Sequence, residues 1–169
     1  MLRIALAGNP NAGKTTVFNA LTGDNQHVGN WPGKTVEKLA GHFRHQDYQI
    51  EIIDLPGTYS LSTYTPEEEI ARNYLVQTKP DLVINVVDAS HFERNLYLTM
   101  QILETGLPTL ILLNMSDLAS RHGQTIDTAK LASLLGNVPV LQATASKHNG
   151  LTELKDSIIQ FVNSPCRNH

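Results

Sequence analysis

The sequence contains little cysteine, no excess of positive charge and no long hydrophobic run, and each shortage excludes a class of protein. Because only one of the 169 residues is cysteine, no disulfide can form within the chain, which excludes a disulfide-stabilised secreted mini-protein. Lys and Arg number 13 against 16 Asp and Glu, a net charge of -3, which excludes a basic nucleic-acid-binding module. No apolar run approaches the roughly 18 residues that cross a bilayer, and we expect no signal peptide in the short apolar start. An apolar content of 41% instead indicates a globular chain that can bury a core.

Short apolar runs alternate with segments of helical periodicity along the chain. Strands are expected at residues 2–8, 81–87, 107–113 and 138–141, with a hairpin at residues 35–43 and 48–53. Helices are expected at residues 14–21, 66–76, 95–105, 127–135 and 150–162, and a polar loop at residues 22–32. The alternation predicts an α/β fold in which a mostly parallel sheet of six or seven strands carries helices on both faces. We expect one domain over residues 1–163, followed by a tail at residues 164–169.

A glycine-rich motif follows the first expected strand and begins the first expected helix. The pattern G-x-x-x-x-G-K-[ST] is formed by Gly8, Asn9, Pro10, Asn11, Ala12, Gly13, Lys14 and Thr15, and Thr16 follows it. In such a loop, backbone N–H groups and the helix N-terminus bind phosphate oxygens, and the two glycines allow close approach. Lys14 supplies a positive charge for the β- and γ-phosphates, and the Thr15 hydroxyl is a suitable Mg²⁺ ligand. The motif in this position predicts a nucleoside triphosphate site.

Three further residues are candidates for the Mg²⁺ and γ-phosphate end of this site. Asp54 follows an expected strand in the segment Asp-Leu-Pro-Gly, and its carboxylate can hold Mg²⁺ through a water. Gly57 ends that segment and offers its backbone to the γ-phosphate, although an ordinary Asp-Pro-Gly turn is the alternative. Thr35 lies where the loop after the first expected helix enters the second expected strand and can add a second hydroxyl to Mg²⁺, with ordinary strand entry as its alternative role.

The segment Asn114-Met115-Ser116-Asp117 follows another expected strand and indicates guanine as the base. An ionised Asp is acceptor-only, so Asp117 can accept from both guanine donors, N1–H and the 2-amino group, whereas adenine presents an acceptor at N1. A helix cap is the alternative role of this segment. Small residues follow the last expected strand and let backbone N–H groups reach the guanine carbonyl oxygen; they are Ala143, Thr144 and Ala145. Together the motifs predict binding of GTP rather than ATP.

In this order the motifs resemble the translation-factor-like class of small GTPase domains, and four segments resemble one family more closely. These segments are residues 8–16, 28–37, 54–61 and 85–98. They are similar to the N-terminal G domain of the bacterial ferrous iron transport protein B family, and the likeness covers nearly the whole chain. The Gly-Asn-Trp-Pro-Gly loop around Trp31 and the Leu-Pro-Gly-Thr-Tyr-Ser-Leu segment are the specific features, because GTPases in general lack them.

The resemblance implies a function and a wider molecular setting. Members of the family are bacterial inner-membrane Fe²⁺ transporters whose cytoplasmic G domain binds and hydrolyses GTP, which implies that this domain regulates or drives iron uptake. Helical and transmembrane domains follow the G domain, so we expect this chain to be a fragment whose partners are those domains. An oligomer could form through the membrane domain, and no nucleic acid is expected as a partner.

The resemblance also implies roles for individual residues. Asn11 would coordinate a K⁺ ion that compensates for a missing arginine finger, and backbone carbonyls of the loop holding Trp31 would grip the same ion. Gly33 and Thr35, in that loop, are assigned to the nucleotide site. Because phosphoryl transfer needs little covalent chemistry from the protein, catalysis is expected to be positioning and charge stabilisation. That role is assigned to Lys14, Asn11, Thr35 and Gly57, with Mg²⁺ on Thr15, Thr35 and Asp54.

Three positions depart from the wider GTPase pattern. Thr58 stands where many GTPases place a Gln that orients the attacking water, so slow hydrolysis or positioning by backbone is expected. Met115 stands where a Lys often stacks along the base, which indicates modest affinity and quick exchange. Ala143 replaces a more usual Ser, which leaves that contact to backbone N–H groups. A nucleotide-responsive switch module with negligible hydrolysis therefore remains an alternative, as does a ribosome- or tRNA-associated GTPase, which the acidic balance disfavours.

Other residues that could suggest a site have plainer interpretations. The histidines His27, His42 and His45 have no cysteine or carboxylate cluster at ligand spacing, which favours surface histidines over an Fe²⁺ site. The polar and Pro-Gly flanks of Trp31 favour a mobile loop over the core. Three glutamates at residues 67–69 follow the expected N-cap Thr65 and indicate an acidic helix start rather than a general base. Structural or neutral roles are expected for Arg94 and Cys166.

Overall fold

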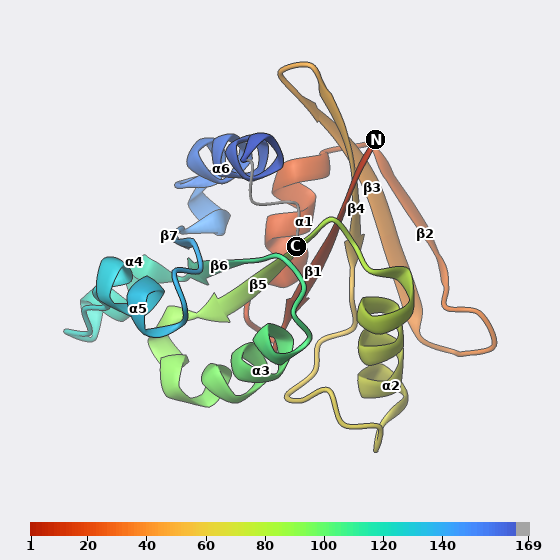
Figure 1. Ribbon diagram of the computed structural model, residues 1–169, viewed down its shortest axis with the longest axis horizontal. Helices are drawn as coiled ribbons and strands as arrows, with labels where there is room; N and C mark the ends of the chain where they lie inside the picture. Colours follow the sequence, from red (N-terminus) through yellow and green to blue (C-terminus); the bar gives the residue numbers. More distant parts are fainter. Residues whose placement is uncertain (165–169) are drawn as a thin grey trace.

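The computed structural model describes residues 1–164, which form a seven-stranded sheet with helices on both faces (Figure 1). The strand order is β2-β3-β4-β1-β5-β6-β7. Neighbouring strands from β4 to β7 are parallel, and β3 is antiparallel to both β2 and β4. The strands are β1 (Leu2–Gly8), β2 (Gln26–Asn30), β3 (Glu37–His45), β4 (Tyr48–Asp54), β5 (Leu82–Asp88), β6 (Thr109–Asn114) and β7 (Val140–Gln142). The prediction of a mostly parallel α/β sheet is confirmed.

Six α-helices lie among the described residues, joined by short turns of other helical types. They are α1 (Lys14–Thr22), α2 (Pro66–Asn73), α3 (Phe92–Glu104), α4 (Ser116–Arg121), α5 (Thr128–Leu134) and α6 (Leu151–Asn163). A π-helical turn (Tyr74–Thr78) extends α2, and 3₁₀ turns occur at Ala89–His91 and Ala145–Lys147. None of the helices in residues 1–164 has the length and hydropathy that crossing a membrane requires.

The alternation of side chains along β1 divides the core into two layers. Leu2, Ile4 and Leu6 pack in one cluster with residues of α1 and α6, whereas Ala5 and Ala7 pack in a second cluster with residues of α2 and α3. This is the period of two that a strand imposes when both of its faces are covered. Figure 1 shows the two pairs of helices on opposite sides of the sheet. The core therefore holds the central strands, and the loops at their ends, in a fixed frame.

The parallel strands bring the predicted motifs to one edge of the sheet. In the strand register Leu6 lies beside Asp54, and Asp88 lies beside Asn114, so β1, β4, β5 and β6 end close together. The phosphate loop, residues 8–15, leaves β1 at this edge and leads directly into α1. Because the carboxyl ends of parallel strands form the usual ligand site of such folds, a ligand site is expected at this edge.

Two local predictions were wrong on the antiparallel side of the sheet. Residues 26–30 were expected to lie in a polar loop, but they form β2, which pairs with β3 from Gln26 opposite Gly41 to Asn30 opposite Glu37. All five β2 residues are exposed, so no apolar alternation marks the strand; its backbone ladder with β3 holds it, and the Gln26 amide donates to Asn19 Oδ1 and the Thr22 hydroxyl of α1. Trp31, expected in a mobile loop, is only 8% exposed.

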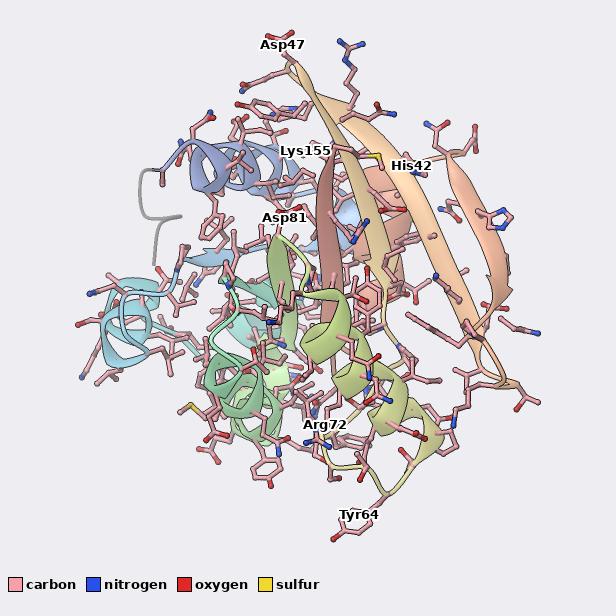
Figure 2. All side chains as sticks on the ribbon, turned by 45° about the vertical axis from the view of Figure 1, so that its right-hand side comes forward. His42, Asp47, Tyr64, Arg72, Asp81 and Lys155 are labelled. Carbon is pink, nitrogen blue, oxygen red and sulfur yellow. The ribbon has the colours of Figure 1, made fainter. Side chains whose placement is uncertain are left out.

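Trp31 is buried because residues of other elements cover its ring, Tyr74 from the turn after α2 and Lys38 from β3. Its indole meets the Tyr74 ring edge-on at 5.6 Å, and the Lys38 ammonium lies 4.9 Å from the indole centroid. Burial raises the pKa of Tyr74 to about 12. By contrast Tyr64, in the loop that precedes α2, is 93% exposed and projects from the molecule in Figure 2. Tertiary contacts, and not local composition, decide which aromatic residue enters the core.

Helix boundaries also differ in detail from the expected ones. α3 begins at Phe92, earlier than expected, and the expected helix at 66–76 divides into α2 and the π-helical turn. Thr65 caps α2 as expected, because its hydroxyl accepts a hydrogen bond from the Glu68 N–H at 3.2 Å. α4 was not expected, since its six residues are too few to show a helical period. Of the expected tail, only Ser164 is among the described residues, and Cys166 lies outside them.

Candidate nucleotide site

The phosphate loop has a backbone that only glycine permits at two positions. Gly13 has a φ of +87°, and a Cβ there would lie 2.2 Å from Asn114 Nδ2. A Cβ on Gly8 would lie 2.5 Å from the Val86 carbonyl oxygen in β5. Asn11 also has a positive φ, +66°, which asparagine tolerates better than most residues. The loop therefore curves tightly between β5 and the β6 end, with α1 beginning at its last residues.

A buried ion pair joins the phosphate loop to the end of β4. Lys14 Nζ lies 2.7 Å from Asp54 Oδ1, and the two side chains are only 9% and 5% exposed. The Thr15 hydroxyl donates to Asp54 Oδ2 at 3.2 Å. A hydroxyl and a carboxylate at this spacing form the kind of hard-oxygen set that Mg²⁺ prefers, so these residues fit that ion. The lysine that the motif assigns to phosphate and the aspartate that it assigns to metal are thus adjacent.

A cavity of about 480 Å³ lies at the phosphate loop. Its lining residues are Asn9, Pro10, Asn11, Gly13, Lys14, Thr15, Thr16, Gly57 and Met115. Gly57 belongs to the β4–α2 loop, residues 55–65, and a Cβ on it would lie 3.1 Å from Pro10 Cα. The Thr58 N–H donates to the Gly8 carbonyl at 3.1 Å. The β4–α2 loop therefore begins directly against the phosphate loop.

Asn114 connects the phosphate loop with the two loops that follow β6 and β7. Its Nδ2 donates to the Ala12 carbonyl at 3.0 Å, and its Oδ1 accepts from the Ala145 N–H at 3.0 Å. The Ser116 N–H also donates to the Ala143 carbonyl at 3.2 Å. The Asn114 side chain is buried and has both of its polar atoms paired, so three loops are held in one arrangement.

Asp117 receives side-chain donors on both oxygens. Lys147 Nζ lies 2.7 Å from Oδ2, and the Thr144 hydroxyl lies 3.4 Å from Oδ1. The hydrogen bond from Lys147 holds the pKa of Asp117 below its usual range, so the carboxylate is ionised at neutral pH. Met115, in the left-handed region with a φ of +59°, starts the turn that presents Asp117 on α4. Sequence reasoning missed Lys147, and no local signal distinguishes it from any other surface lysine.

The loop between β2 and β3, residues 31–36, is not part of the phosphate-loop cavity. Neither Gly33 nor Thr35 lines that cavity, and both are exposed. Lys34 Nζ instead lies 2.9 Å from Glu69 Oε2 on α2, and Trp31 packs on the turn that extends α2. The structure thus assembles residues 8–16, Asp54, Gly57 and the β6 and β7 loops, and places Thr35 apart from them.

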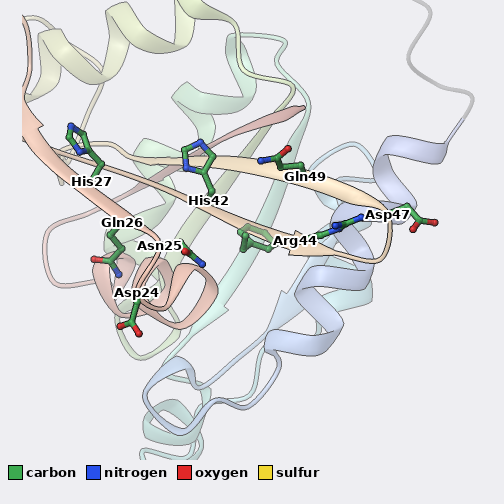
Figure 3. Close-up of a pocket in the computed structure, with 9 residues that line it drawn as sticks. Asp24, Asn25, Gln26, His27, His42, Arg44, Asp47 and Gln49 are labelled. Carbon is green, nitrogen blue, oxygen red and sulfur yellow. The ribbon is translucent and has the colours of Figure 1, made fainter.

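A cavity of about 630 Å³ lies at the β2 edge of the sheet and has mixed polar walls. Figure 3 shows His27 and His42 there, on the neighbouring strands β2 and β3. Within residues 1–164 no three His, Cys, Asp or Glu side chains are grouped closely enough to hold a metal ion. His45 lies outside this cavity, with its Nε2 2.7 Å from Asp156 Oδ1 on α6. The interpretation of these residues as surface histidines agrees with these positions.

A seven-stranded sheet with a phosphate loop between β1 and α1, an aspartate at the end of β4 and Asn114 bridging the adjacent loops defines a G domain, the fold of P-loop GTPases. The sequence profile of one family, described as ferrous iron transport protein B, matches residues 2–158. The chain belongs to this family.

Relatives in this family include large proteins and separate G domains. The Fe(2+) transport protein A/Fe(2+) transporter FeoB fusion protein of Porphyromonas gingivalis is 54% identical over 162 residues, which are 95% of this chain and 19% of that protein. The cytosolic domain of the T. maritima FeoB iron transporter in its GMPPNP form superposes with a TM-score of 0.94 at 45% identity, covering 98% of this chain and 65% of that one. The FeoB G-domain of Methanococcus jannaschii superposes with a TM-score of 0.85 at 45% identity, covering 96% of this chain and 98% of that one. The chain spans about a fifth of the length of the curated relatives it matches.

Proposed function

We propose that this domain binds GTP and hydrolyses it to GDP and phosphate. The observation that carries the proposal is the pair of hydrogen bonds made by Asn114, which join the phosphate loop to the loops beside Asp117 in one site. A phosphate-binding end and a base-binding end are thereby held at a constant separation. The GMPPNP and GDP forms of the T. maritima cytosolic domain support guanine nucleotide as the ligand.

Asp117 selects the base in this proposal. Its carboxylate accepts guanine N1–H and the 2-amino group, and its low pKa keeps it acceptor-only at neutral pH. Adenine would place an acceptor against the same oxygens and leave them unpaired, which discriminates strongly between bases. Backbone N–H groups in the loop after Ala143, which contains Thr144 and Ala145, would donate hydrogen bonds to the guanine carbonyl oxygen. Lys147 must share or release Asp117 when guanine binds.

Hydrolysis follows from charge stabilisation at the other end of the site. A water oxygen bonds to the γ-phosphorus as the bond to the β–γ bridging oxygen breaks, and charge spreads over the phosphate oxygens. Lys14 and the N–H groups of residues 8–16 would stabilise that charge, and Gly57 would contact the γ-phosphate through its backbone. Mg²⁺, when bound by Thr15, Asp54 and Thr35, supplies further positive charge. Thr35 would have to move for this, because its loop lies apart from the cavity.

K⁺ is proposed as a second cation, held by Asn11 and by backbone of the loop that contains Trp31 and Gly33. Asn11 lines the phosphate-loop cavity and is exposed, so its side-chain oxygen is free to take a cation. The ion supplies positive charge at a place where other GTPases use an arginine. Arg94 does not fill that place, since its guanidinium lies over the Tyr59 ring at 5.8 Å.

In the whole protein we propose that nucleotide binding and hydrolysis regulate or drive Fe²⁺ uptake from the cytoplasmic side of the bacterial inner membrane. The relatives described as Fe(2+) transporters support this setting, and it is favoured over a ribosome- or tRNA-associated role. The partners would be the helical and transmembrane domains, and an oligomer could form through the latter.

The test is GTP hydrolysis by the purified chain with Mg²⁺, in KCl and then in NaCl at equal ionic strength. Faster turnover in KCl is expected, and Asn11→Ala should abolish that difference while nucleotide binding is retained. Equal rates in both salts would remove K⁺ and Asn11 from the mechanism. Tight GTP binding without turnover in either salt would favour the nucleotide-responsive switch module, which Thr58 in place of a water-orienting Gln allows.

A further inference from the structure

The side chain of Asn9 is buried at the base of the phosphate loop with half of its hydrogen-bonding capacity unused. Asn9 is 2% exposed, and its Nδ2 donates to the Arg94 carbonyl in α3 at 3.4 Å. Its Oδ1 is buried and has no partner among the described residues, a property shared there only with Trp31 Nε1. A buried acceptor without a donor destabilises a fold, so such an atom needs an explanation.

A buried asparagine with a purely structural role looks different, and β5 supplies the comparison. Asn85 is 1% exposed, its Nδ2 donates to the Ala7 carbonyl at 3.3 Å, and its Oδ1 accepts from the Thr99 hydroxyl at 2.6 Å. Both ends of Asn85 are therefore satisfied within the fold. Asn9 follows β1, the strand that pairs with β5, and its Oδ1 has no donor like the Thr99 hydroxyl that satisfies Asn85. Packing alone therefore does not account for the Asn9 amide.

The β4–α2 loop passes beside Asn9 and carries a donor. The Thr58 N–H donates to the carbonyl of Gly8, the residue before Asn9, at 3.1 Å. Thr58 is 4% exposed as a residue, but its hydroxyl oxygen is not among the fully buried unpaired atoms of residues 1–164; it makes no hydrogen bond within those residues and keeps access to solvent, so it is available as a donor. An unused acceptor and an unused donor are thus held on adjoining stretches of backbone.

Asn9 also ties this region to α3. Its Nδ2 contact is to the backbone of Arg94, whose guanidinium lies 5.8 Å from the centroid of the Tyr59 ring. Asn9 thus links the phosphate loop to α3, and the start of the β4–α2 loop contacts both of these segments through Thr58 and Tyr59. A Cβ on Gly57 would lie 3.1 Å from Pro10 Cα, so the backbone of residue 57 lies close against the phosphate loop beside residues 8 and 9.

We propose that Asn9 is a positioning residue for GTP hydrolysis: its Oδ1 accepts the Thr58 hydroxyl when Gly57 turns toward the γ-phosphate. The bond holds the β4–α2 loop in its hydrolytic arrangement and transmits that arrangement to α3 through the Arg94 carbonyl. This inference rests on the proposed GTPase function, and in it the Asn9 side chain touches neither substrate nor cation. Without this arrangement, Asn9 Oδ1 stays buried and unpaired, which lowers the stability of the fold.

The experiment compares Asn9→Leu, Thr58→Val and the double variant in the purified chain, with Asn85→Leu as the matched control. Asn9→Leu and Thr58→Val are each expected to lower kcat about tenfold with KM little changed, and the double variant to be no slower than either. The ratio of GMPPNP to GDP affinity should fall in both single variants while GDP affinity stays within about twofold. Asn85→Leu should instead lower the melting temperature and leave kcat and the affinity ratio unchanged.

Stability without nucleotide provides the second readout. Removing an unpaired buried acceptor should leave the melting temperature of Asn9→Leu at or above that of the parent, and Asn9→Ala tests the same point without added volume. Additive losses in the double variant, or equal weakening of GDP and GMPPNP binding, would overturn the inference. If the parent binds both nucleotides but hydrolyses no GTP, the inference is tested by the ratio of GMPPNP to GDP affinity, which should still fall in Asn9→Leu and Thr58→Val; an unchanged ratio would overturn it. If the parent binds no guanine nucleotide, the proposed function and the inference fail together.

Discussion

Lys147 and Asp117 face each other at the proposed base-binding end of the site, with Lys147 Nζ 2.7 Å from Asp117 Oδ2. The aspartate that would read guanine is thus already paired with a lysine from the loop after β7. The contact lowers the pKa of the Asp117 carboxyl, and it places a half-exposed side chain against the oxygens that are proposed to accept the base. Under the proposed assignment, guanine must compete with Lys147 for the Asp117 carboxylate.

The pH dependence of guanine nucleotide binding should reveal this pair. Because Asp117 has a lowered pKa, its ionised form persists as pH falls through the ordinary carboxyl range, and the contribution of the pair is lost only below that range. Lys147→Met should return the pKa toward its usual value, so GDP affinity should start to fall at a higher pH than in the parent. Affinity measured from about pH 7 to about pH 4 checks this. Superimposable profiles would mean that Lys147 does not set the charge of Asp117.

Asp117→Ala should relax the preference for guanine over adenine. Without the carboxylate, guanine loses two hydrogen bonds and adenine no longer meets unpaired acceptors, so the affinities should converge. Competition of GTP and ATP for the site measures the preference. The control is Asp127→Ala, which removes the side-chain cap of α5 at the Lys130 N–H and should leave the preference unchanged. An undiminished guanine preference in Asp117→Ala would contradict the assignment.

Lys14→Met should cost both stability and hydrolysis. The substitution leaves Asp54 charged and buried without its partner, which is expected to lower the free energy of unfolding by about 3 kcal/mol. The double variant Lys14→Met/Asp54→Asn should recover much of that loss in denaturant unfolding but none of the hydrolysis, because the phosphate charge stays unopposed. A single variant as stable as the parent would show that the ion pair contributes little.

Gly13→Ala should disrupt the site more than another glycine with the same backbone demand. Gly136 has a φ of +81° and open space around its Cβ position, so Gly136→Ala should cost about 1 kcal/mol of backbone strain alone. Gly13→Ala adds a clash with Asn114 Nδ2, which must give up its bond to the Ala12 carbonyl, for a total of about 3 kcal/mol. Unfolding and GDP affinity separate the two: only Gly13→Ala should weaken GDP. Equal effects would contradict the bridging role of Asn114.

The single tryptophan should report movement of its loop. Trp31 is buried on Tyr74 and Lys38, whereas Thr35, four residues on, must approach the phosphate-loop cavity to reach Mg²⁺. Adding GMPPNP and Mg²⁺ should therefore shift the emission of Trp31 to longer wavelength, while GDP should have a smaller effect. Tyr74→Ala should produce part of the shift without nucleotide. Identical spectra with and without GMPPNP would mean that Thr35 moves independently of Trp31.

Much of the fold was predictable because its signals are local. β1 alternates between two covered faces, β5 consists mostly of branched apolar residues, and Thr65 with the adjacent Pro66 begins α2. β2 gave no such signal, since its five exposed residues depend on a ladder with β3. The burial of Trp31 was likewise invisible, because the rings and charges around it come from Tyr74 and Lys38.

The sequence by itself determined the α/β class and the kinds of groups present at the strand ends, because periodicity and the glycine, lysine and acidic motifs are local properties. Only the tertiary structure decided which of these groups meet. It brought Asp54 to Lys14, Lys147 to Asp117 and the unpaired amide oxygen of Asn9 to the β4–α2 loop, while it held Thr35 apart. The reason is physical: the register of parallel strands and the packing of two helical layers set distances between residues that are far apart in the chain.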